Sequence, residues 1–144
     1  MAEKTTTRTA AEAGITIEPN PNRVVVRIDG QVVADSTRAL VMRAPGTPPV
    51  QYIPRHDVDM KQLVRTPLVT HCPYKGDAVY WSITTPERTV EDAVWSYETP
   101  REGVTEIAGL LAFYSDRVDA IEELPRTVAG AGEARSGDPS RAVR

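Results

Sequence analysis

The stretch "THCPYKGDAVYW", Thr70 to Trp81, is the most informative part of the sequence for the fold. It holds the only cysteine of the chain, one of its two histidines, and a lysine directly before a glycine. Pro73 fixes its own φ angle, and Gly76 permits backbone conformations that other residues resist. We therefore predict a turn over Pro73–Gly76 that joins the core to a ligand pocket and leads into a strand.

Alternating apolar residues and turn signals predict strands on both sides of this stretch. "RVVVRI" (23–28) and "QVVADS" (31–36) flank Asp29-Gly30, a strong hairpin signal. Further strands are expected at 38–44, 50–53, 77–84 and 89–98, with two short ones in 110–123 and helical turns or loops at 55–64 and 101–109. Aromatic residues of 77–84 and 89–98 are expected to pair across the two strands. The pattern predicts a mostly β fold: a compact single domain of antiparallel strands, small and barrel-like, with one or two short helical turns.

The two ends of the chain differ from this middle. Residues 1–22 are rich in Thr and Ala, and residues 125–144 are rich in Gly, Ser, Arg and Pro. Neither end has enough large apolar residues to offset the entropy lost on ordering. We therefore expect disordered tails at 1–22 and 125–144 around a single β-rich domain at 23–124.

Charge and composition exclude several classes of function. Between Arg23 and Leu124 the chain has eleven Lys and Arg against fifteen Asp and Glu, whereas a nucleic-acid binder needs a basic face. No apolar run approaches the roughly 18–20 residues that span a bilayer, and the N-terminus does not resemble a signal peptide. One cysteine cannot form an internal disulfide, which favours the reducing cytoplasm. We expect a small-molecule partner, neither nucleic acid nor membrane, and leave a homodimer open.

The sole cysteine is the first candidate for chemistry. Neighbouring His71 and Cys72 point to opposite faces of a regular strand, which weakens both a zinc site and a Cys–His dyad. His56 is an alternative base from elsewhere in the chain, but a lone cysteine in a β-rich core is more often a small buried hydrophobe than a nucleophile. We expect no metal and no cofactor. The catalytic candidates left open are Cys72, Lys75, Arg55 and His71.

A second candidate is the "DVD" pair, Asp57 and Asp59. On a strand both carboxylates would lie on one face and could hold the Mg²⁺ of a nucleotidyl transfer. The surrounding segment is more typical of a turn than of a strand, with Asp57 near a helix N-cap. The chain also has no GxxxxGK[ST] or GxGxxG motif. The structural role is therefore favoured over the catalytic one.

The third candidate is a pocket of cations and aromatic rings. Lys75 stands on the predicted turn, and Arg55 follows a tyrosine and a proline closely. Such groups suit a small molecule that is anionic or contains a ring. All eight aromatic residues lie between Tyr52 and Tyr114, so the second half of the chain should build the pocket. The predicted ligand-binding residues are Tyr52, Arg55, Tyr74, Lys75, Tyr80, Trp81, Trp95 and Tyr97.

Four segments together resemble a known family: "YIPRHDVDM", "THCPYKGDAVYWSI", "EDAVWSYETP" and "EIAGLLAFYSDRVD". It is a bacterial and fungal family of domains of unknown function that also carries a nucleotidyltransferase label. The resemblance covers about Val24 to Glu122, and its most specific motifs are CPYKG with a following YW, WxYxxP and AFY. It implies a compact, mostly β fold similar to the β-tent of certain small zinc-binding proteins. This chain lacks the paired cysteines of those proteins.

Three hypotheses for the function follow. The domain binds or transforms a small, anionic or ring-containing metabolite; or it transfers nucleotidyl groups with a metal held by Asp57 and Asp59; or it is a non-catalytic interaction module whose aromatic residues form the core. Whether it is an enzyme stays open at this point.

Overall fold

Antiparallel strands are the main regular structure of the described residues, which confirms the predicted mostly β fold class. The computed structural model describes residues 10–126. Its strands are β1 (Thr16–Pro19), β2 (Arg23–Ile28), β3 (Gln31–Ser36), β4 (Leu40–Arg43), β5 (Val50–Tyr52), β6 (Leu63–Cys72), β7 (Gly76–Thr84), β8 (Thr89–Ser96), β9 (Leu111–Phe113) and β10 (Ala120–Leu124). Three short 3-10 turns interrupt them: η1 (Arg55–Asp57), η2 (Met60–Gln62) and η3 (Thr105–Ile107).

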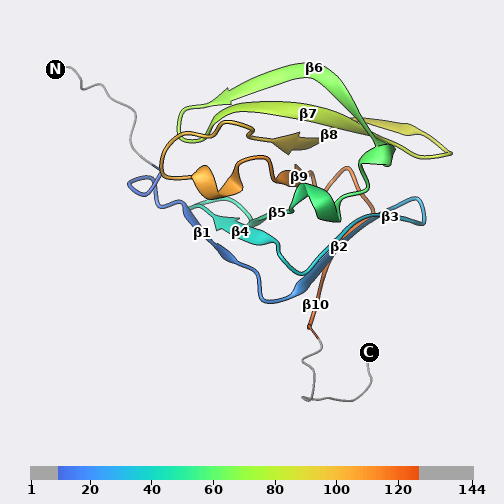
Figure 1. Ribbon diagram of the computed structural model, residues 1–144, viewed down its shortest axis with the longest axis horizontal. Coiled ribbons are helices and arrows are strands. Elements are labelled where there is room, and N and C mark those ends of the chain that lie inside the picture. Colours follow the sequence, from blue (N-terminus) through green and yellow to red (C-terminus); the bar gives the residue numbers. More distant parts are fainter. Residues whose placement is uncertain (1–9, 127–144) are drawn as a thin grey trace.

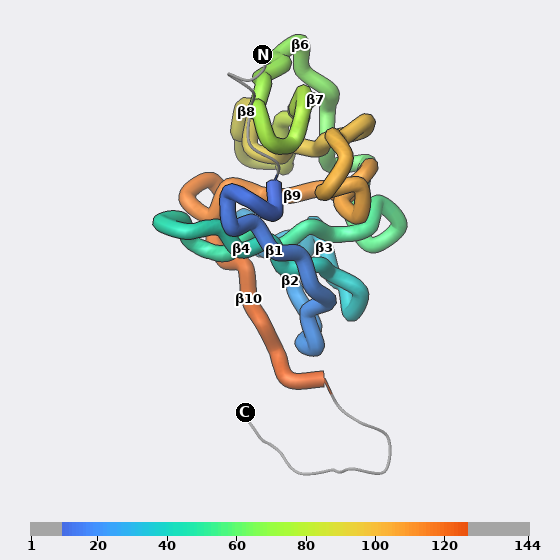
Figure 2. The backbone as a smooth tube through the Cα atoms, turned by 90° about the vertical axis from the view of Figure 1, so that its left-hand side faces the viewer, coloured from blue at the N-terminus to red at the C-terminus, as the bar shows by residue number. Residues whose placement is uncertain are grey.

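The strands form three antiparallel sheets (Figure 1). We call β1-β4-β5 the small sheet, β10-β2-β3 the terminal sheet, and β6-β7-β8-β9 the long sheet. In the view of Figure 2, β6, β7 and β8 lie at one end of the molecule and β2 and β10 towards the other, with β1, β3, β4 and β9 between them. The predicted Asp29-Gly30 hairpin joins β2 to β3, and both residues have the positive φ angles that such turns require.

Single backbone bridges connect the sheets. Ile53 and Leu111 exchange two N–H···O=C bonds of 2.8 Å, so the small sheet continues into the edge of the long sheet. On the other side, the Asp59 N–H donates to the Val33 carbonyl at 2.8 Å and holds the η1–η2 segment against the terminal sheet. The described sheets do not close on themselves, so the fold is a bent, layered sheet rather than the barrel-like shape considered above.

Two hydrophobic clusters lie on opposite faces of the long sheet, because successive side chains of a strand point in opposite directions. The first cluster packs Val26 and Ile28 of the terminal sheet against Trp81 of β7. The second cluster packs Tyr52 of the small sheet against Tyr80 of β7. Strand β7 therefore separates the two clusters and contributes neighbouring residues to each.

Two boundaries predicted from the sequence need correction. Residues 1–22 were expected to be disordered, but within them β1 pairs with β4 from Thr16↔Arg43 to Pro19↔Leu40. The half-buried Ile15 and Ile17 also pack against the second cluster. The start of β6 was read as part of a helical turn or loop, although the strand begins at Leu63. The remainder of the predicted tails, 1–9 and 127–144, lies outside the described residues.

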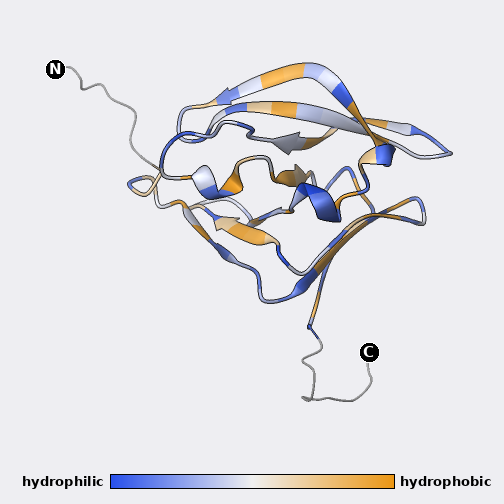
Figure 3. Cartoon of the chain, in the orientation of Figure 1, coloured by the Kyte–Doolittle hydropathy of each residue, from blue (hydrophilic) through white to orange (hydrophobic). Residues whose placement is uncertain are grey.

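Strand β6 is the most exposed strand of the long sheet. This exposure explains why the sequence pattern did not predict it. Val64, Leu68 and Val69 are between 38% and 56% exposed, so the strand has no buried apolar face to produce alternation. Figure 3 shows apolar residues along this outer strand. None of the helical segments within residues 10–126 has the length and apolar character needed to cross a membrane.

Candidate functional site

The turn between β6 and β7 has the form predicted from Pro73 and Gly76. The Lys75 N–H donates to the Cys72 carbonyl at 3.2 Å, and Gly76 has φ +109°, a conformation that side-chain-bearing residues rarely adopt. The Arg101 N–H donates to the Lys75 carbonyl at 2.9 Å, which ties the turn to the loop after β8. Lys75 is thus held in a defined position by its backbone.

Four of the five tyrosines meet on the second-cluster face of the long sheet. They are Tyr52 of β5, Tyr80 of β7, and Tyr97 and Tyr114, which directly follow β8 and β9. With Trp95 they form a group that we call the phenol cluster. The side chain of Cys72 packs against it and is half-buried.

Ring contacts and hydrogen bonds fix this cluster. The Trp95 Nε1–H donates to the Tyr52 hydroxyl at 3.3 Å, and the two rings meet edge to face at 6.4 Å. The Tyr114 ring lies 4.5 Å from the Trp95 ring. The hydroxyls of Tyr80 and Thr70 are hydrogen-bonded at 2.9 Å. Tyr52, Tyr80 and Tyr97 are buried, whereas Trp95 and Tyr114 keep part of their surface in contact with solvent.

Burial moves the ionisation of three of these phenols further above neutral pH. It raises the pKa of both Tyr52 and Tyr114 from the ordinary value of 10.0 to about 12 and also raises the pKa of Tyr97. At neutral pH these hydroxyls are therefore hydrogen-bond donors and acceptors, not bases. The cluster can present O–H groups to a ligand, but its phenols do not supply a general base.

Two cations of the described residues contact this cluster: Lys75, and Arg117, whose guanidinium lies 5.2 Å from the centre of the Tyr114 ring. The Lys75 ammonium lies 5.8 Å from the centre of the Tyr97 ring, a cation–π distance, and the side chain is half-buried. Among residues 10–126 no carboxylate forms an ion pair with it. The Arg101 side chain packs nearby over Gly76. Within the described residues, the Lys75 ammonium therefore faces an aromatic ring rather than a carboxylate.

The structure does not bring His71 and Cys72 together. The His71 Nδ1 contacts the Asp77 carboxylate at 2.8 Å, with both side chains about two-thirds exposed. Cys72 packs instead against the phenol cluster, on the other face of the strand. This separation agrees with the alternation expected of neighbouring strand residues. Tyr74, in the same turn, is half-buried.

Arg55 and Trp81, which the sequence analysis placed in the same pocket as Lys75, lie on the opposite face. Trp81 belongs to the first cluster, and its ring is flanked by Arg55 at 5.5 Å and Arg65 at 5.2 Å. Both guanidinium groups lie about 4 Å from the same oxygen of Glu98. Of the aromatic residues expected to pair across these two strands, Tyr80 and Trp95 do stand opposite each other, whereas Trp81 stands opposite Val94.

The two aspartates of "DVD" have structural roles. Asp57 accepts hydrogen bonds from the Ser36 hydroxyl at 2.7 Å and from the Arg38 guanidinium at 3.0 Å. Burial alone would raise the pKa of Asp57, but these hydrogen bonds outweigh it and lower the pKa. Asp59, rather than Asp57, caps a turn: its side chain accepts from the backbone N–H of Lys61 at the start of η2. No group of carboxylates, histidines and cysteine within 10–126 is arranged to hold a metal ion.

Sequence reasoning missed two residues of the phenol cluster and its surroundings. Tyr114 was noted only as part of the AFY motif, and Thr70 was not considered. Strand alternation gives the missing signal for Tyr114, because Phe113 is buried in the first cluster and the next side chain must face the second. No sequence pattern indicates Thr70, because its partner Tyr80 is reached only across the β6–β7 pairing.

Comparison with known proteins gives one result that bears on identity. No curated protein matches the chain. A family model described as "Domain of unknown function (DUF427)" matches residues 16–124, which cover every strand from β1 to β10. The chain therefore belongs to the DUF427 family of domains of unknown function.

Proposed function

We propose that the domain binds a small molecule that carries both a ring and an anionic group, at the phenol cluster beside Lys75. The observation that carries this proposal is the position of the Lys75 ammonium, over Tyr97 and without a carboxylate partner among the described residues. A half-buried ammonium without a counter-ion is less stable than a paired one, because burial removes part of its hydration. An anionic ligand group would supply the missing charge.

The ring part of the proposal rests on Trp95 and Tyr114. Their rings lie 4.5 Å apart, tilted by 43°, and both remain partly exposed although they belong to a packed cluster. Exposed faces of aromatic rings bind other rings by offset or edge-to-face contact. The protonated phenols would donate hydrogen bonds to acceptor oxygens of the same ligand.

We rank binding above catalysis. The phenols are protonated at neutral pH, and His71 pairs with Asp77 away from the cluster. Cys72 is the thiol beside the proposed site, so an enzymatic role by thiol attack would depend on it. A chain with one cysteine also suits a reducing compartment such as the cytoplasm.

A thermal-shift screen of metabolites tests the proposal, because a ligand that binds the native state raises the melting temperature. We expect stabilisation by at least one ring-containing anion. Lys75→Ala should abolish this shift while changing the free energy of unfolding by less than about 0.5 kcal/mol, as for most substitutions of partly exposed side chains. Lys61→Ala, which removes the other lysine of the described chain, is the matched control and should keep the shift.

Two outcomes would contradict the proposal. One is that no ring-containing anion stabilises the wild-type chain. The other is that Lys75→Ala and Lys61→Ala respond to a stabilising ligand in the same way.

A further inference from the structure

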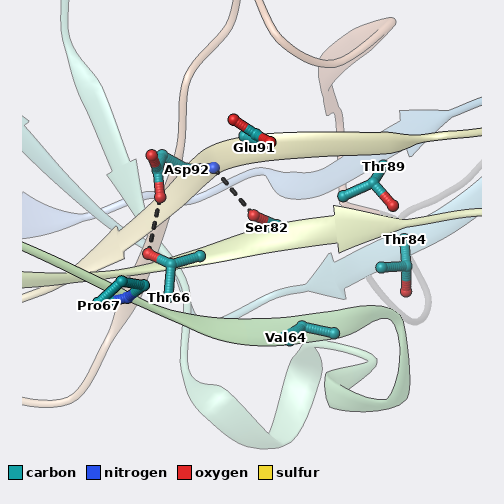
Figure 4. Close-up of a pocket in the computed structure, with 8 residues that line it drawn as sticks. All are labelled: Val64, Thr66, Pro67, Ser82, Thr84, Thr89, Glu91 and Asp92. Carbon is teal, nitrogen blue, oxygen red and sulfur yellow. Dashed lines mark hydrogen bonds between the residues drawn. The ribbon is translucent and has the colours of Figure 1, made fainter.

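A groove of about 440 Å³ lies on the long sheet, away from Lys75, and no function is yet assigned to it (Figure 4). Its volume lies in the range typical of small-molecule sites. Strand β7 supplies the middle of the groove through Ser82 and Thr84. They lie on the same face of β7 as Ala78 and Tyr80, because alternate residues of a strand share a face. Towards the C-terminal end of β7 the side chains on this face become polar.

The walls of the groove differ in chemistry. On the β6 side, Val64 and Pro67 present apolar surface to solvent. On the β8 side, Thr89, Glu91 and Asp92 present a hydroxyl and two carboxylates. Among the described residues, no lysine or arginine side chain lines the groove. Its occupant therefore needs one apolar side and one side rich in hydrogen-bond donors.

Asp92 owes its position to a β-bulge. The pairing of β7 with β8 runs from Trp81↔Val94 to Ile83↔Val90, so three residues of β8 face Ser82 alone. Asp92, the middle one of the three, has φ +51°, which is unusual for a residue other than glycine. Bulges of this kind redirect a side chain out of the regular alternation.

Three other side chains hold the bulge. The Asp92 N–H donates to the Ser82 hydroxyl at 3.1 Å, and the Thr66 hydroxyl donates to the Asp92 carboxylate at 2.7 Å. Arg117 donates to the backbone carbonyl of Glu91 at 2.7 Å from the other side. A strained backbone persists only where its surroundings fix it in this way, and such positions are frequent at binding sites.

We propose that this groove binds a neutral, sugar-sized polyol. A pyranose ring has an apolar C–H face that suits Val64 and Pro67, and hydroxyl groups along its edge that can donate to the carboxylates of Asp92 and Glu91. The hydroxyls of Ser82 and Thr89 can both donate and accept, which matches the same property of a sugar hydroxyl. The proposal concerns a different ligand and a different part of the sheet from the Lys75 site.

Amide chemical shifts of the ¹⁵N-labelled full chain test this inference. The probes are glucose, galactose, mannose, maltose and lactose, each titrated to tens of millimolar, a range that covers weak sugar binding. We expect at least one of them to shift the amide signals of Ser82 and Asp92 to saturation, while the signal of Lys75 stays in place. Because Lys75 belongs to the proposed anion site, an unchanged Lys75 signal distinguishes binding in the groove from binding at that site.

Asp92→Asn is the decisive variant. Asparagine tolerates positive φ and still accepts the hydrogen bond from Thr66, so the bulge should survive. Loss of the charge should weaken sugar binding about tenfold, because hydrogen bonds to charged acceptors are stronger than those to neutral ones. Asp77→Asn, an exposed aspartate at the start of the same strand β7, is the control and should bind as the wild type does.

Three results would overturn the inference. The first is the absence of saturable shifts at Ser82 and Asp92 with all five sugars. The second is saturable binding of 1,4-diaminobutane at these amides instead, which would make the groove a cation site. The third is unchanged sugar affinity in Asp92→Asn.

Discussion

Tyr80 and Trp81 are adjacent residues of β7 that belong to different hydrophobic clusters. Tyr80 reaches the phenol cluster and the Thr70 hydroxyl, and Trp81 reaches Arg55 and Arg65 on the other face. This division decides which of the predicted ligand-binding residues can act together. Tyr52, Lys75, Tyr80, Trp95 and Tyr97 can do so, whereas Arg55 and Trp81 belong to a separate surface.

The buried phenols should ionise at a higher pH in the folded chain than in the unfolded chain. Tyr52 and Tyr114 ionise near pH 12 in the folded chain but near pH 10 when unfolded, so the folded state holds protons that the unfolded state has lost. Stability from this source is complete below pH 10 and is lost as the pH rises towards 12. Tyrosinate absorbance of the native chain should therefore lag behind that of the chain in guanidinium chloride, with circular dichroism as the check that the fold persists. Coincident titration curves would show that these phenols are solvated.

The same residues show what the sequence could and could not reveal. Pro73 and Gly76 gave the β6–β7 turn correctly, because their conformational limits are local properties. The grouping of Arg55 with Lys75 was an assumption about distant parts of the chain, and no local pattern tests such a contact. Alternation along β7 would have separated Trp81 from Tyr80, had it been applied to the ligand-binding set as well as to the core.

At the scale of single elements, β1 and β6 are the strands that the sequence did not reveal. Both have exposed residues on most positions, so neither shows the alternation by which a half-buried strand is recognised. Their pairing partners, β4 and β7, hold them in place through backbone hydrogen bonds that every sequence can form. Strands with a buried face, such as β2, β3 and β7, were predicted close to their observed bounds.

Removal of β1 should destabilise the domain. The segment before Arg23 contributes the half-buried Ile15 and Ile17 to the second cluster and adds a strand to the small sheet. The partial burial of two such side chains corresponds to about 2–3 kcal/mol. We expect chemical denaturation to show a loss of this size in a chain that starts at Arg23, compared with one that starts at Ala10. Equal midpoints for the two chains would mean that the domain begins at Arg23 after all.

At the scale of the whole molecule, the long sheet carries two polar features on the second-cluster face. Lys75 and the phenol cluster lie where the small sheet covers the long sheet, and the groove around Asp92 lies further along β7. The terminal sheet covers the opposite face and contributes only apolar packing to the first cluster. We therefore expect ligand binding to depend on the long sheet and its junction with the small sheet, and the terminal sheet to serve mainly stability.

We propose the phenol cluster beside Lys75 as the principal ligand site of the domain. The two tryptophans of the chain provide a direct test, because each gives one indole N–H signal in an NMR spectrum. Trp95 reports on the phenol cluster through its hydrogen bond to Tyr52, and Trp81 reports on the arginine-flanked surface of the opposite face. The measurement is the titration of the labelled chain with the compound that raises its melting temperature most. We expect the Trp95 signal to shift to saturation while the Trp81 signal stays in place; a shift of Trp81 with Trp95 unchanged would rule out the phenol cluster as the ligand site.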